Sequence, residues 1–149
     1  MPLTSGVNHV AVVTTDVDRL IGFYGQVFDA DVTMDLDEGD MRHAAIHVGG
    51  GACLHAFEMP DNPHAAGSTA MFGRGHLDHI AFDIPDAATF DEVRRRLVDA
   101  GASDGLCTDF GMVRVVTFID PDGIEVEIAQ WLAGEPRTYD EARREPFTV

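Results

Sequence analysis

Apolar and polar residues alternate near the start of the chain, and this pattern predicts a β-strand followed by an amphipathic helix. One face of residues 7–13 carries the set that defines a half-buried strand, namely Val7, His9, Ala11 and Val13. After Asp16 the apolar residues change to helical spacing and form one stripe of Leu20, Phe23, Tyr24, Val27 and Phe28. We therefore expect a helix that Asp16 caps at its N-terminus.

Period-two alternation then returns in three short segments, which predict three further strands. They cover residues 29–37, 41–49 and 52–59, and the turn sequences DEGD and GGG separate them. The first part of the chain is thus expected to form a β-α-β-β-β module.

The same order of elements repeats after a segment rich in Pro, Gly and Asn. Residues 76–84 predict a strand, and Asp86 then opens a helix that Gly101 ends. The core face of this helix carries Phe90, Val93, Leu97 and Ala100. Three more strands are predicted, and a DPDG turn joins the last two of them: 102–110, 112–119 and 124–132.

The repeat predicts one α+β domain over residues 1–131, made of module one (6–59), a link (60–75) and module two (76–131). Neither module can bury both faces of its sheet alone. We therefore expect two paired βαβββ modules that form a curved mixed β-sheet, with the helices outside and a cleft on the inner face.

The last residues, 132–149, are polar and irregular, and we expect a surface arm or a dimer contact there. The sequence TYDE (138–141) within this tail is typical of a capping box that opens a short helix.

Composition excludes several classes of partner. The net charge of -16, from 26 acidic and 10 basic residues, gives a surface that repels nucleic-acid phosphates and anionic lipid headgroups. No apolar run reaches the length of a membrane span and the first residues do not resemble a signal peptide, so we expect a cytoplasmic protein. Cys53 and Cys107 match no zinc spacing and are interpreted as small buried hydrophobes in a reducing compartment.

Four polar side chains fall at equivalent positions of the two modules. Alignment on the first strands sets His9 against His79, and alignment on the last strands sets His55 against Glu127. A single strand histidine is commonly a hydrogen-bonded core residue and a single glutamate is commonly solvated, but their symmetric placement favours a shared site. Two imidazoles and a carboxylate suit a 2-His-1-carboxylate centre for a divalent metal with open positions.

The chain resembles the vicinal oxygen chelate superfamily over residues 6–131. The resemblance rests on the βαβββ repeat, on NHVAV and DHIAF at the module starts, and on FIDPDGIEVEIAQ near the end. The superfamily includes glyoxalase I, methylmalonyl-CoA epimerase, extradiol dioxygenases, and fosfomycin- and bleomycin-resistance proteins. The resemblance implies a small-molecule substrate and a divalent metal on His9, His79 and Glu127, with His55 as a fourth ligand or an acid–base group.

His55 separates the reactions that the resemblance implies. Glyoxalase I-like enzymes carry a glutamate at this position, whereas extradiol dioxygenases have their acid–base histidine on this strand. An extradiol-type dioxygenase with Fe(II) is therefore the leading hypothesis, although Zn, Ni and Mn suit the same ligands.

Two alternatives to the dioxygenase stay open. The extradiol pattern expects a tyrosine where this chain has Thr117, so one alternative is a glyoxalase-type lyase or epimerase-type isomerase in which Glu127 or His55 transfers a proton through an enediolate. The other is a metal-free protein that sequesters a drug, as bleomycin-resistance proteins do.

Three further residues are candidates for substrate binding. Arg114 precedes the DPDG turn and can pair with a substrate carboxylate, although a solvated position fits the pattern equally well. Thr117 and His47 are the others, and periodicity leaves open whether His43 and His47 face the pocket or solvent. By resemblance we also expect a homodimer, with the cleft within one chain or between two.

Overall fold

The computed structural model describes residues 3–4, 6–39, 41–62, 73 and 76–148. The chain divides into two compact units, Met1–Gly67 and Ser68–Val149, and each is described by itself. Most of the predicted link, residues 60–75, lies outside the described part of the chain.

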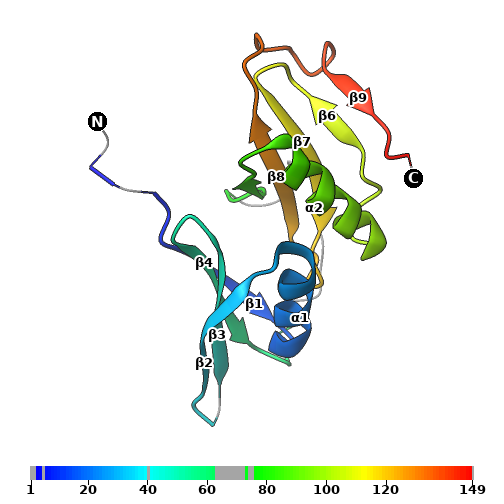
Figure 1. Cartoon of the computed structure of the whole chain (residues 1–149). Coiled ribbons are helices and arrows are strands. Elements are labelled where there is room, and N and C mark those ends of the chain that lie inside the picture. The colour runs from blue at the N-terminus through cyan, green and yellow to red at the C-terminus, as the bar shows by residue number, and fades with distance from the viewer. Residues whose placement is uncertain (1–2, 5, 40, 63–72, 74–75, 149) are drawn as a thin grey trace. The chain divides into compact units, whose positions relative to one another are not determined.

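The first unit contains one helix and a four-stranded sheet (Figure 1). Its elements are, in chain order, β1 (His9–Thr14), α1 (Val17–Phe28), β2 (Asp31–Asp37), β3 (Arg42–Gly49) and β4 (Ala52–Glu58). The strand order is β1-β4-β3-β2; β1 runs parallel to β4, and the other pairs are antiparallel.

Helix α1 covers one face of this sheet and leaves the other face open. The side chain of Asp16 accepts a hydrogen bond from the Arg19 amide at 3.0 Å, which confirms the predicted cap. The buried residues of α1 pack with one face of the sheet: Val17, Leu20, Tyr24 and Val27 on the helix, and Val12, Ala44, Ile46, Leu54 and Ala56 on the strands. Alternation along the strands therefore places the histidines on the open face.

The second unit repeats this arrangement and adds a strand. Its elements are β5 (Ile80–Asp83), α2 (Ala87–Asp99), β6 (Cys107–Asp109), β7 (Val113–Ile119), β8 (Glu125–Trp131) and β9 (Arg143–Glu145). The strand order is β5-β8-β7-β6-β9, with β5 parallel to β8 (Figure 1).

Both predicted ends of α2 are confirmed. Asp86 accepts from the Thr89 amide at 2.9 Å, and Gly101 has a φ of 68° directly after the last turn, a conformation that favours glycine. The helix buries Phe90, Val93 and Leu97, and the facing strands bury Val116, Phe118, Val126 and Ile128.

The DPDG turn fixes the register of the last two strands of the repeat. Asp120 accepts hydrogen bonds from the Asp122 and Ile124 amides, both at 2.9 Å, and Gly123 adopts a φ of 82°. This turn sets Ile119 opposite Glu125, so Thr117 lies opposite Glu127.

The α+β class and the two βαβββ modules are confirmed, and hydrogen bonds divide the strands between two mixed sheets. The predicted strand 102–110 shrinks to Cys107–Asp109. The Ser103 hydroxyl accepts from the Gly105 amide and the Asp104 carboxylate accepts from the Leu106 amide, so these residues form a turn instead.

The tail prediction was wrong in two respects. Residues 143–145 form the edge strand β9, which pairs antiparallel with β6. Glu141 accepts hydrogen bonds from the amide and hydroxyl of Thr138, as in a capping box, but these bonds close a turn and no helix follows. A three-residue strand with exposed side chains has no hydrophobic period, so pattern alone could not reveal it.

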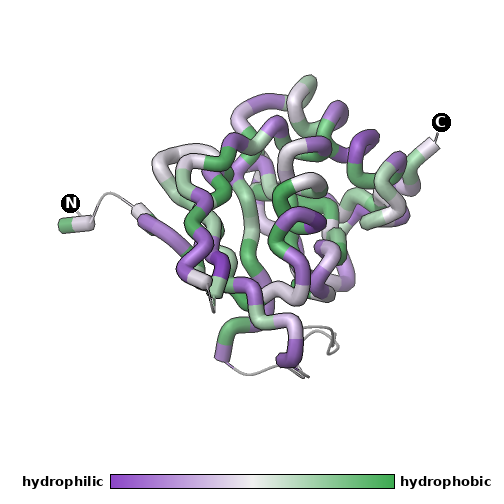
Figure 2. Tube along the Cα trace, turned by 90° about the horizontal axis from the view of Figure 1, so that it is seen from below, coloured by the Kyte–Doolittle hydropathy of each residue, from purple (hydrophilic) through white to green (hydrophobic). Residues whose placement is uncertain are grey.

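Apolar and polar residues are mixed over short distances along the whole trace (Figure 2). Among the described residues, no helix is long and apolar enough to cross a membrane.

Candidate metal centre

The open face of the first sheet carries a group of histidines. The strand register sets Ala11 opposite His55, so His9, two residues earlier on β1, lies diagonal to His55 on the same face. The two rings meet edge to face with centroids 5.9 Å apart. The predicted proximity of His9 and His55 is therefore present within the first unit.

His43 joins this pair, and the sequence left its orientation open. Its Nδ1 lies 2.9 Å from Nε2 of His55, and its ring stacks on Phe57 with an interplanar angle of 3°. His47 lies opposite Cys53 in the same alternating set, so it shares this face. These contacts depend on the register of β3 and β4, which sets Ala45 opposite His55 and so places His43 diagonal to His55.

The environment of His55 favours a neutral imidazole. Burial lowers the pKa of His55, and the neighbouring rings of His43 and His9 lower it further. A neutral imidazole can accept a proton or bind a metal at neutral pH.

The open face of the second sheet places His79 beside Glu127. Ala81 pairs with Glu127, so His79, two residues earlier, lies diagonal to it, and its Nε2 is 3.7 Å from Oε2 of Glu127. The Thr117 hydroxyl lies 3.5 Å from the other carboxylate oxygen. Burial raises the pKa of Glu127, and His79 and Thr117 oppose this effect without cancelling it.

The residue before each of the two module-start histidines orients its ring. Asn8 Oδ1 lies 2.9 Å from Nδ1 of His9, and Asp78 Oδ2 lies 2.9 Å from Nδ1 of His79. Both oxygens can accept a hydrogen bond from Nδ1, so these contacts hold each ring in place. Hydrogen bonds of this kind orient metal-ligating histidines in many proteins.

Arg114 does not belong to this face, so its predicted place beside the other site residues is corrected. It lies three residues from Thr117 along β7, and alternation therefore directs the two side chains to opposite faces. Its guanidinium lies 4.0 Å above the ring centroid of Phe90 in α2, and its Nε donates to Gln130 at 2.9 Å. The same alternation was visible in the sequence and could have excluded it.

The sequence matches one known protein superfamily over most of its length. Residues 6–128 match the family model described as the Glyoxalase/Bleomycin resistance protein/Dioxygenase superfamily. The chain belongs to this superfamily. No curated protein matches the sequence significantly.

Solved structures of the superfamily share the fold at low sequence identity. A glyoxylase/bleomycin resistance protein/dioxygenase domain from Frankia sp. EAN1pec superposes with a TM-score of 0.71 at 24% identity, covering 89% of this chain and 96% of that one. Fosfomycin resistance protein FosX from Listeria monocytogenes, complexed with Mn(II) and sulfate, gives 0.60 at 18% identity and 93% and 98% coverage. A glyoxalase family protein from Enterococcus faecalis gives 0.63 at 20% identity and 83% and 96% coverage. At these identities the likeness shows the fold alone.

The donor set suits the divalent metal that superfamily proteins commonly bind. Glu127 is a carboxylate with 14% side-chain exposure, and Nε2 of the imidazole beside it lies 3.7 Å from Oε2. A buried carboxylate without a cation is costly, and a divalent ion would remove that cost. Within the described residues, no three His, Cys, Asp or Glu side chains are already arranged to hold an ion.

Proposed function

We propose that this protein is a divalent-metal-dependent enzyme acting on a small molecule that bears two neighbouring oxygen atoms. His9, His79 and Glu127 would hold the ion, with Fe(II) as the first hypothesis and Zn, Ni or Mn as alternatives. The observation that carries the proposal is the pairing of the half-buried Glu127 carboxylate with Nε2 of His79, whose other nitrogen is held by Asp78. When bound, the ion would supply Lewis acidity and open positions for the substrate oxygens.

His55 would move the proton in this reaction. Its Nε2 is engaged by His43, so Nδ1 is the nitrogen left for a substrate hydroxyl. Its lowered pKa keeps the ring neutral and ready to accept a proton at neutral pH. In this role His43 orients the ring; the alternative role of His55 is that of a fourth metal ligand.

The leading reaction is an extradiol-type ring cleavage, because a neutral histidine occupies the position that glutamate holds in glyoxalase I-like enzymes. The second candidate is a lyase or isomerase that works through an enediolate. Thr117 favours this second candidate. The hydroxyl that lies 3.5 Å from Oε1 of Glu127 belongs to a threonine, whereas the extradiol pattern has a tyrosine at this position.

Anaerobic reconstitution with Fe(II), followed by oxygen-uptake assays on a panel of catechols, tests the leading reaction. We expect uptake that disappears in Glu127→Ala and persists in His76→Gln, a matched variant of an exposed histidine. Turnover of a hemithioacetal or an epimerisable acid without oxygen uptake would favour the second candidate. Drug binding without any metal dependence would refute both and support a sequestering protein.

The proposal also includes the assembly and location expected from the resemblance, a cytoplasmic homodimer. Sedimentation velocity measurements across a range of protein concentrations test the dimer, and a single monomeric species would contradict it.

A further inference from the structure

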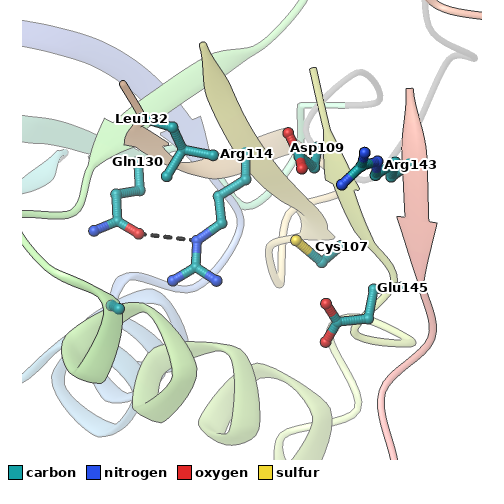
Figure 3. Close-up of a pocket in the computed structure, with 8 residues that line it drawn as sticks. Cys107, Asp109, Arg114, Gln130, Leu132, Arg143 and Glu145 are labelled. Atoms are coloured by element: carbon teal, nitrogen blue, oxygen red, sulfur yellow. Dashed lines mark hydrogen bonds between the residues drawn. The ribbon is translucent and has the colours of Figure 1, made fainter. Parts of the chain in front are cut away.

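A cavity lies on the α2 side of the second sheet (Figure 3), and alternation along β8 places Glu127 on the other face. Its volume is about 490 Å³, within the range of small-molecule pockets. Cys107, Leu132 and Ala87 contribute apolar surface, and Arg114 reaches in from β7. The cavity is separate from the proposed metal centre, because the side chains of Arg114 and Thr117 lie on opposite faces of β7.

Both carboxylates that line this cavity already have arginine partners that do not line it. Asp109 lies 2.9 Å from the Arg137 guanidinium, and its pKa is held down first by the Gly111 amide and then by that arginine. Glu145 lies 3.2 Å from Arg94. The acidic side chains of the cavity are therefore compensated before its own arginines are counted.

The carboxylate that pairs with Arg114 is distant and exposed. The Arg114 side chain is 20% exposed, and its carboxylate partner, Asp91, lies at 3.8 Å. Its Nε is occupied by the neutral Gln130, and its Nη2 is buried without a hydrogen-bond acceptor among the described residues (Figure 3). Since Nη2 is enclosed and Nε is occupied, Nη1 is the nitrogen that an anion in the cavity can reach, and such an anion would stabilise the mostly buried guanidinium. Arg143, from β9, adds a further positive charge to the cavity lining.

We infer that this cavity binds a small organic carboxylate, with the carboxylate on Arg114 and the apolar body against Cys107, Leu132 and Ala87. A carboxylate makes a charge-assisted hydrogen bond with a guanidinium nitrogen, and Phe90 covers one face of this guanidinium. The apolar walls favour a ligand with a hydrocarbon body.

Titration of the full-length protein with benzoate, followed by amide chemical shifts and calorimetry, tests this inference. We expect saturable binding with shifts at Cys107 and Leu132, and no comparable binding of benzamide, which has the same shape and no charge. Arg114→Gln should weaken benzoate binding by at least about tenfold, the loss expected for one charge-assisted pair. The matched control is Arg144→Gln, which removes an equal charge from β9 at a residue stacked on Tyr139, and it should bind as the wild type does.

A second variant protects the test against misfolding. Ala87 is exposed at the start of α2, so Ala87→Leu narrows the cavity without disturbing the core, and it should also weaken benzoate binding. The inference is overturned if benzoate does not bind, if benzamide binds equally well, or if folded Arg114→Gln and Ala87→Leu bind like the wild type. None of these results bears on the metal-dependent activity, which is assayed separately.

Discussion

Replacement of Arg94 by methionine should detach the C-terminal strand from the second sheet. Arg94 lies on α2 with only 7% of its side chain exposed. Its Nε donates to the Gly105 carbonyl and its Nη2 to the Glu145 carbonyl, both at 2.7 Å. Methionine fills the space of the stem but leaves the carbonyls of Gly105 and Glu145 without their donors.

The expected loss follows from these two bonds. A hydrogen bond from a charged donor contributes about 1.5–3 kcal/mol, so the two bonds give a decrease in unfolding free energy of about 3–6 kcal/mol. The ion pair with the Glu145 side chain adds little, because that carboxylate is 76% exposed. Arg95→Met is the matched control: Arg95 is 50% exposed on the same helix and pairs with Glu92 and Asp99, so its loss should have little effect on stability.

Urea unfolding of both variants measures these free energies, and hydrogen exchange of the β9 amides locates the change. We expect fast exchange at Arg143 and Glu145 in Arg94→Met and native exchange in Arg95→Met. The reasoning is refuted if the two variants lose the same stability, or if the β9 amides stay protected without Arg94.

Three further predictions follow from local geometry and charge. Gly111→Ala should lower the free energy of urea unfolding by at least about 3 kcal/mol, because the φ of Gly111 is 82° and a Cβ there would overlap the Glu135 carbonyl. Gly101, with a φ of 68°, has open space around the added Cβ, so Gly101→Ala should lower it by about 1–2 kcal/mol. Equal losses in the two variants would contradict the overlap. Burial raises the pKa of Glu127, so the contribution of this side chain to stability is complete at low pH and is lost as pH rises. Glu127→Gln should therefore stabilise the metal-free protein at about pH 7 and have no effect below about pH 4. The opposite pH trend would contradict this prediction. The imidazole of His55 should titrate below the ordinary value of 6.5 in an NMR titration of the metal-free protein, and a higher pKa would remove its assigned role as a base.

Features set by local residue patterns could be predicted from the sequence. The caps at Asp16 and Asp86 follow from side chains that bond to an amide three residues away. The facing positions of Thr117 and Glu127 follow from the DPDG turn, which fixes the register of β7 and β8. These signals lie within a few residues of the atoms that they position.

Features set by contacts between distant segments could not be predicted. Strand β9 depends on Arg94, which donates to residues 11 and 51 positions away, and no sequence period reports such bonds. The bond between His43 and His55 depends on the β3–β4 register, which shifts between His47 and Gly49. Alternation along β7 predicts which face of the sheet carries Arg114, but its contacts with Phe90 and Gln130 could not be predicted.

Metal binding tests the central claim most directly. Calorimetric titration of the metal-free protein with Fe(II) under anaerobic conditions, and with Zn, Ni and Mn, should give saturable, stoichiometric binding in the wild type and in His76→Gln. His9→Ala, His79→Ala and Glu127→Gln should each lose affinity by at least about tenfold. Undiminished binding in all three variants, or no binding of any of these ions by the wild type, would contradict the proposed metal centre.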